Sequence, residues 1–246
     1  MTIIPAICSS LFEVCATQPL DVIKTHYQTN TKVIYTFRNL YSGFIPRAFG
    51  NIPSRTTFLY SQDFFKSYYS TKNISDIQKN IIIPMSAGFC QTLVDTPFEV
   101  LKINKIMNVH NTFLYKGFIP HCTRNIIFLI SVYNFREYSK KNNIQQNIFI
   151  NSLYGGIGGV FGAYISHPFD TIKTRIQSNQ NYKIKDYFNG YKSRYTSIST
   201  FLSDKKGRSA YISSFFIGSH LRASMSMVNM FVSLSMFELF KILNIF

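Results

Sequence analysis

The chain has 246 residues and a net charge of +15, with 16% aromatic but only 15% charged residues. So few charges in so aromatic a chain indicate contact with lipid, while the surplus of bases favours an anionic partner: nucleic acid, lipid headgroups or a small anionic solute. A mean hydropathy of +0.03 excludes a bundle that is surrounded by lipid on every face. We therefore expect helices with one apolar face and one polar face.

The predicted elements are six helices. In chain order they cover residues 3–24, 46–69, 80–106, 120–139, 148–176 and 218–244. Each has about the 20 residues with which a helix crosses the apolar core of a bilayer. The apolar N-terminus has no basic n-region and no cleavage site, so we expect a retained first helix and not a signal peptide. The predicted fold class is an all-α integral membrane protein with six transmembrane helices.

A motif of proline, acid and lysine recurs at the ends of the first, third and fifth helices. "QPLDVIKTHYQ", "TPFEVLKINKI" and "HPFDTIKTRIQ" each place an acid two residues after the proline and a lysine five residues after it. One such match is most often a solvated ion pair at a helix end. Three in register predict one domain, 1–246, made of two-helix repeats over residues 1–73, 74–145 and 146–246. The motif residues are Pro19, Asp21, Lys24, Pro97, Glu99, Lys102, Pro168, Asp170 and Lys173.

A second charged layer recurs at the ends of the other three helices. Gly43, Gly117 and Gly218 are each followed 20 residues later by an acid, with a base three residues beyond it. Residues three apart lie on nearly the same face of a helix, so each pair can reach two neighbouring helices. We call these six residues the outer layer: Asp63, Lys66, Glu137, Lys140, Glu238 and Lys241.

The combined pattern resembles the mitochondrial carrier family over nearly the whole chain. The resemblance rests on the threefold P-x-[DE]-x-x-K motif, the aromatic-x-Gly stretches and the acid-x-x-base pairs. It implies a monomeric transporter with pseudo-threefold symmetry, whose aqueous cavity opens alternately to the two sides of the mitochondrial inner membrane. For a viral chain, that membrane would be the host's. Membrane lipids, cardiolipin among them, are further implied partners.

The resemblance makes gates of the two charged layers. The motif acids and lysines, here called the proline-motif ring, would close the matrix end by pairing Asp21 with Lys102, Glu99 with Lys173 and Asp170 with Lys24. The outer layer would close the cytoplasmic end by pairing Asp63 with Lys140, Glu137 with Lys241 and Glu238 with Lys66. Gln28 and Gln177 would brace the proline-motif ring, and the three prolines would bend their helices. Unpaired charges at membrane depth are costly, so each ring is tolerable only when it is closed or wetted.

The family's substrate contacts lie twelve or thirteen residues before each acid of the outer layer. These positions hold Gly50, Arg124, Asn125, Met225 and Ser226. In the family, an arginine at the position of Arg124 goes with carboxylate-bearing solutes. Further cavity candidates are Glu13, Arg47, Arg55, His121 and Arg222, and Asp95 is a candidate support for the gate. In "YKGF", Lys116 and Gly117 resemble the cardiolipin signature, where free N–H groups at a helix start can meet a lipid phosphate.

The predicted function is transport, by exchange, of an anionic metabolite. A nucleotide or deoxynucleotide is favoured, and the alternatives are a carboxylate or other small-metabolite carrier and a carrier-like scaffold that does not transport. No nucleophile–base pair, phosphate loop or metal-ligand spacing occurs in the sequence, so we expect no enzyme activity, no cofactor and no metal. The basic linker after Gln177 lacks a nucleic-acid-binding motif, so we expect no nucleic-acid partner.

Overall fold

The computed structural model describes residues 3–72, 74–141, 148–178 and 215–229. These ranges contain five long helices: α1 (Ile3–Thr29), α3 (Phe44–Ser70), α4 (Asp76–Met107), α5 (Phe118–Lys141) and α6 (Ile148–Ser178). A single turn, α2 (Phe37–Leu40), lies in the first linker, and residues 219–229 are helical. The described ranges hold no strand. Five predicted helices are thus present over their full length, and the sixth is described as far as residue 229.

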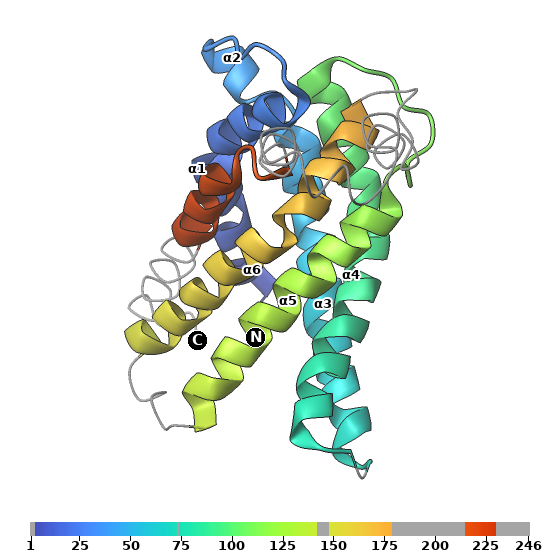
Figure 1. Ribbon diagram of the computed structural model, residues 1–246, viewed down its shortest axis with the longest axis vertical. Helices are drawn as coiled ribbons and strands as arrows, with labels where there is room; N and C mark the ends of the chain where they lie inside the picture. The colour runs from blue at the N-terminus through green and yellow to red at the C-terminus, as the bar shows by residue number, and fades with distance from the viewer. Residues whose placement is uncertain (1–2, 73, 142–147, 179–214, 230–246) are drawn as a thin grey trace, which may run out of the picture.

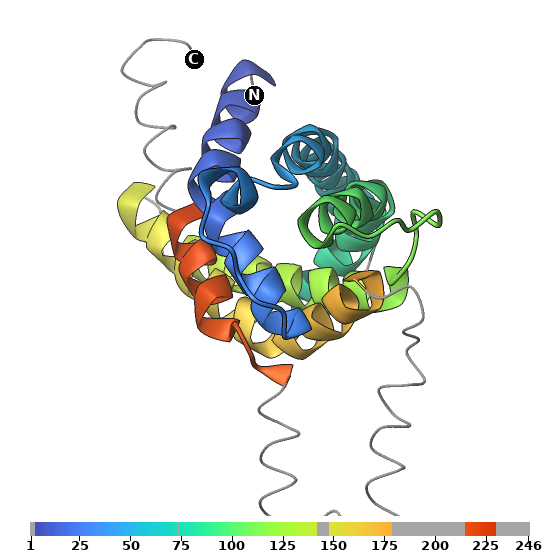
Figure 2. The same ribbon diagram turned by 90° about the horizontal axis from the view of Figure 1, so that it is seen from above.

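The helices stand in a ring around a central axis (Figures 1 and 2). Around this ring, α1 packs against α3, α3 against α4, α4 against α5 and α5 against α6. The helix over 219–229 lies beside α1 and α6 in both views, and α1 also contacts α6 directly. The first helix and the last described residues therefore meet and close the ring.

The motif prolines lie inside long helices, and the helix continues through each of them. Proline has no N–H group, so the carbonyl four residues earlier loses its helical donor. The Tyr41 hydroxyl donates to one such carbonyl, that of Cys15, at 3.3 Å. The Tyr115 hydroxyl donates to another, that of Leu93, at 3.2 Å. Two linker tyrosines thus replace hydrogen bonds that Pro19 and Pro97 remove.

Three glycines begin the helices that follow the linkers, and all three have a left-handed backbone conformation. Their φ angles are 76° at Gly43, 74° at Gly117 and 81° at Gly218. Only glycine adopts this region without strain. Each glycine also lies against the motif lysine of another repeat: a Cβ atom would come 3.0 Å from the Lys102 carbonyl, 3.6 Å from the Lys173 carbonyl and 3.2 Å from Lys24 Cγ, respectively. A side chain at Gly43 or Gly218 would press against the neighbouring lysine, whereas a Cβ atom at Gly117 would make ordinary contacts.

Helix boundaries differ in places from those predicted. α1 continues to Thr29, beyond its expected end at residue 24, so Gln28 is helical. α4 begins with a capping box, in which Ser75 Oγ accepts the Gln78 N–H and the Gln78 side chain accepts from the Ser75 N–H. Six transmembrane helices were expected; within the described ranges, however, no helix combines the length and the hydropathy needed to cross a membrane.

Candidate functional site

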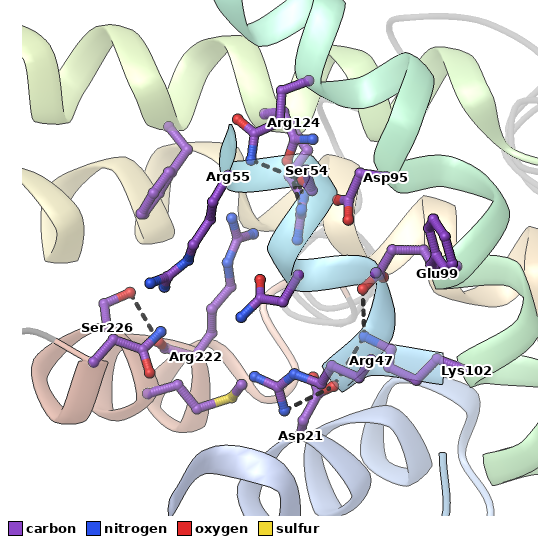
Figure 3. Close-up of a pocket in the computed structure, with 18 of the residues that line it drawn as sticks. Asp21, Arg47, Ser54, Arg55, Asp95, Glu99, Lys102, Arg124, Arg222 and Ser226 are labelled. Atoms are coloured by element: carbon purple, nitrogen blue, oxygen red, sulfur yellow. Dashed lines mark hydrogen bonds and ion pairs between the residues drawn. The ribbon is translucent and has the colours of Figure 1, made fainter. Parts of the chain in front are cut away.

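A polar cavity of about 240 Å³ lies inside the ring of helices (Figure 3). Residues of α1, α3, α4, α5 and the helix over 219–229 line it. Its charged lining consists of three acids, Asp21, Asp95 and Glu99, and six bases, Lys24, Arg47, Arg55, Lys102, Arg124 and Arg222. Because bases outnumber acids in an enclosed space, the cavity attracts anions.

The residues of the proline-motif ring meet at one end of this cavity. The ion pairs between repeats join Asp21 to Lys102, Glu99 to Lys173 and Asp170 to Lys24. Both Lys102 Nζ to Asp21 Oδ2 and Lys24 Nζ to Asp170 Oδ2 measure 2.9 Å. This is the cyclic order that the family resemblance implies. The charged groups are almost entirely buried, which is tolerable only because each has a partner of opposite sign.

Asp170 connects this ring to the cavity. Besides Lys24, its carboxylate accepts hydrogen bonds from Arg124 Nη1 at 3.1 Å and from Gln28 Nε2 at 3.0 Å. Arg222 Nη1 lies 3.8 Å from the same carboxylate. Gln28 thus contacts the ring as expected of a brace, and two cavity arginines converge on one buried acid.

Gln177 is placed differently from its predicted role as a second brace. Its Nε2 atom donates to the backbone carbonyl of Lys116 at 3.0 Å. The backbone carbonyl of Gln177 accepts from Asn111 Nδ2 at 2.6 Å. Since Gln177 lies beside Gly117, its amide holds the start of α5 instead of supporting the ion pair of Lys173.

All five predicted substrate contacts line the cavity: Gly50, Arg124, Asn125, Met225 and Ser226. Gly50 has a packing reason as well, because a Cβ atom there would come 2.4 Å from Phe98 Cβ. Of the further candidates, Arg47, Arg55 and Arg222 also line the cavity, and Glu13 forms an ion pair with Arg55. His121 is buried behind the wall, where its Nε2 lies 3.2 Å from Arg124 Nη2.

An ion pair joins two described residues of the outer layer that were not predicted to be partners. Lys66 Nζ lies 3.6 Å from Glu137 Oε1, with side chains that are 36% and 22% exposed. Lys66 was expected to pair with Glu238, and Glu137 with Lys241. Lys66 also lies 5.2 Å from the centre of the Tyr133 ring, so α3 and α5 approach closely enough for this contact. Glu238, Lys241 and the side chain of Lys140, the predicted partner of Asp63, lie outside the described residues.

A basic cavity closed at one end by ion pairs between helices is suited to holding a small anion. The family model described as "Mitochondrial carrier protein" matches residues 144–244. The chain is 26% identical over 219 residues to the mitochondrial 2-oxodicarboxylate carrier of Rattus norvegicus, covering 70% of this chain and 73% of that one. It is 28% identical over 214 residues to a probable 2-oxodicarboxylate carrier of Schizosaccharomyces pombe, with 69% and 71% covered.

A third relative is the mitochondrial aspartate-glutamate transporter of Saccharomyces cerevisiae. It is 26% identical over 273 residues, which cover 91% of this chain and 29% of the relative. By these matches the chain is similar to the mitochondrial carrier family. The matches support the expected family, and these relatives are named as mitochondrial carriers or transporters, in line with the expected mitochondrial membrane.

Proposed function

We propose that this protein exchanges small dicarboxylates across the mitochondrial inner membrane by alternating access. The relatives above are named as carriers of 2-oxodicarboxylates or of aspartate and glutamate. These names favour the carboxylate alternative, so the initial preference for a nucleotide or deoxynucleotide is set aside.

The observation that carries the proposal is the convergence of Arg124 and Arg222 on Asp170. A guanidinium group presents paired donors that match the geometry of a carboxylate. Here two such groups share one protein carboxylate, at 3.1 and 3.8 Å. A substrate with two carboxylates can give each arginine a partner of its own. The site therefore fits a dicarboxylate better than a monocarboxylate.

The same contacts provide a route from substrate binding to gate opening. Arg124 and Arg222 help to neutralise Asp170, which is also the partner of Lys24 in the proline-motif ring. When a substrate draws the arginines away, Asp170 loses part of its compensation and the closed ring becomes less stable. Binding energy is thus used to open the matrix end, while the outer layer closes the opposite end.

Transport by the purified protein in liposomes tests the proposal. We expect vesicles loaded with 2-oxoglutarate to take up labelled 2-oxoglutarate, aspartate or glutamate, and nucleotides and deoxynucleotides to be poor substrates. Lys173→Ala should abolish the exchange because Glu99 then loses its partner from α6. A panel without uptake above that of empty vesicles would refute transport and support the scaffold alternative.

We propose cardiolipin as a lipid partner at the start of α5. Lys116 brings a positive charge to the start of α5, where the helix dipole also favours a phosphate. Free N–H groups contribute less than expected, because the Phe118 N–H donates to the Tyr115 carbonyl, the His121 N–H donates to the Gly117 carbonyl and Pro120 has no N–H. An apolar groove beside this helix start is suited to an acyl chain and is lined by Leu93, Phe113, Tyr115, Gly117, Phe118, Ile119, Pro120 and Ile176. Mass spectrometry of the detergent-purified protein should detect bound cardiolipin, and less of it after Lys116→Glu. The same spectra test the proposed monomer.

A further inference from the structure

A histidine–aspartate pair lies at the wall of the cavity, apart from the proline-motif ring and the outer layer. Asp95 of α4 points into the cavity, on the same side as Glu99 (Figure 3), and its side chain is 19% exposed. His121 of α5 is fully buried. Its Nε2 atom lies 3.2 Å from Asp95 Oδ2. The transport mechanism above gives this pair no role.

Hydrogen bonding on the far side of the imidazole ring fixes one proton of His121. Nδ1 lies 3.2 Å from Thr96 Oγ1. The single hydroxyl hydrogen of Thr96 is used in a 2.6 Å bond to the carbonyl of Thr92. Thr96 Oγ1 can therefore only accept from His121, so Nδ1 carries a hydrogen.

The proton on Nδ1 makes the contact with Asp95 dependent on a second proton. In a neutral imidazole with hydrogen on Nδ1, Nε2 carries only a lone pair. Arg124 Nη2 at 3.2 Å and Asn125 Nδ2 at 3.3 Å can donate to that lone pair. Even so, the lone pair on Nε2 would repel Asp95 Oδ2, which lies 3.2 Å away. The contact is favourable when the pair holds one more proton, on Asp95, whose carboxyl group then donates to Nε2. A hydrogen on Nε2 itself would face the donors of Arg124 and Asn125.

We propose that Asp95 and His121 form a proton-binding site that takes up a proton when the substrate anion binds. With this proton the pair is neutral, and without it the pair carries one negative charge. The charged groups that face His121 are Asp95 and Glu99 from α4, Arg124 from α5 and Lys173 from α6. Losing the proton places a negative charge beside Arg124, which weakens the attraction of the cavity for an anion. By linkage, proton and anion each raise the affinity for the other by the same factor.

Calorimetry on the purified protein tests this inference, which rests on the proposed binding of dicarboxylates. The probe is 2-oxoglutarate, whose carboxylates are both ionised at neutral pH. Titration in two buffers of different ionisation enthalpy gives the number of protons taken up for each anion bound. In proteoliposomes at constant internal pH, KM should fall by up to about ten-fold for each unit by which the external pH is lowered.

Three variants assign the effect to the pair. Asp95→Asn and His121→Gln each remove one member, and Thr96→Val removes the acceptor that fixes the proton on Nδ1 while preserving shape. All three should lose the proton uptake and the pH dependence of KM. His26→Gln is the matched control: this residue bonds Thr31 at the exposed end of α1 and should leave both responses intact.

Each outcome decides one question. Binding of 2-oxoglutarate by the parent protein without proton uptake, or with a KM independent of pH, overturns the proton site. Proton uptake that persists in the three variants also overturns it, because the proton must then bind elsewhere. A complete lack of 2-oxoglutarate binding refutes the proposed function instead. The parent measurement stands even if a variant does not fold, which thermal unfolding will reveal.

Discussion

Replacing Lys102 by alanine tests the proline-motif ring most directly, because this lysine serves two carboxylates. Its Nζ atom lies 2.9 Å from Asp21 and 2.6 Å from Glu99, and only 6% of its side chain is exposed. Removing one partner of a buried ion pair costs about 3–5 kcal/mol. Here each acid keeps another cation: Lys24 at 3.4 Å and Arg47 at 3.5 Å from Asp21, and Lys173 beside Glu99. We therefore expect a smaller cost, of about 2–3 kcal/mol.

A loss of this size would act on the closed state of the proposed gate. It shifts the equilibrium between closed and open rings by roughly 30- to 150-fold towards the open one, since about 1.4 kcal/mol corresponds to a factor of ten. Exchange of labelled 2-oxoglutarate should fall to the level of empty vesicles, and the unfolding temperature in detergent should drop. Lys105→Ala is the matched control, because Lys105 is an exposed lysine one turn further along α4. Equal transport and equal unfolding temperatures in the two variants would refute the gating role of the ring.

Three further predictions concern a hydroxyl, a guanidinium and a glycine. Tyr115→Phe should lower the free energy of unfolding by about 0.5–1.5 kcal/mol, because the Leu93 carbonyl loses its donor. Thermal unfolding measures this, with the exposed Tyr60→Phe as the control. Equal unfolding temperatures of the two variants would contradict the prediction. Arg124→Lys should raise the KM for dicarboxylates about ten-fold, because an ammonium group cannot replace the paired donors of guanidinium. An unchanged KM would show that Arg124 does not bind the substrate. Gly43→Ala should lower the free energy of unfolding by more than about 1 kcal/mol, since a φ of 76° and the Lys102 carbonyl, 3.0 Å from an added Cβ atom, oppose a side chain. Gly159→Ala is the control, because its added Cβ atom would make only ordinary contacts of 3.7 Å and longer.

The sequence indicated the helices and the charged partners because both depend on spacing along the chain. A motif repeated three times implies which acid meets which lysine, and the ion pairs of the proline-motif ring have that order. Spacing could not indicate that Arg124 and Arg222 share Asp170, since this contact depends on the depth at which three helices approach one another. The role predicted for Gln177 depended in the same way on an unknown neighbour, the start of α5.

The choice of substrate required information of another kind. Counting bases indicated an anion but did not separate nucleotides from carboxylates, because both carry negative charge. The arrangement of guanidinium groups and the named relatives together favour dicarboxylates. The tyrosines two residues before Gly43 and Gly117 were visible in the sequence. Their use became apparent only when each hydroxyl was found opposite a carbonyl freed by proline.

The contacts of the three left-handed glycines affect how the bundle can move. Gly43 lies on Lys102, Gly117 on Lys173 and Gly218 on Lys24, so each linker end rests on a residue of the proline-motif ring that belongs to another repeat. The contacts join the first repeat to the second, the second to the third and the third back to the first. A helix that tilts away from the axis must therefore displace the next linker, which displaces the helix after it. Such a closed chain of contacts favours concerted movement of all three repeats over the opening of any one alone.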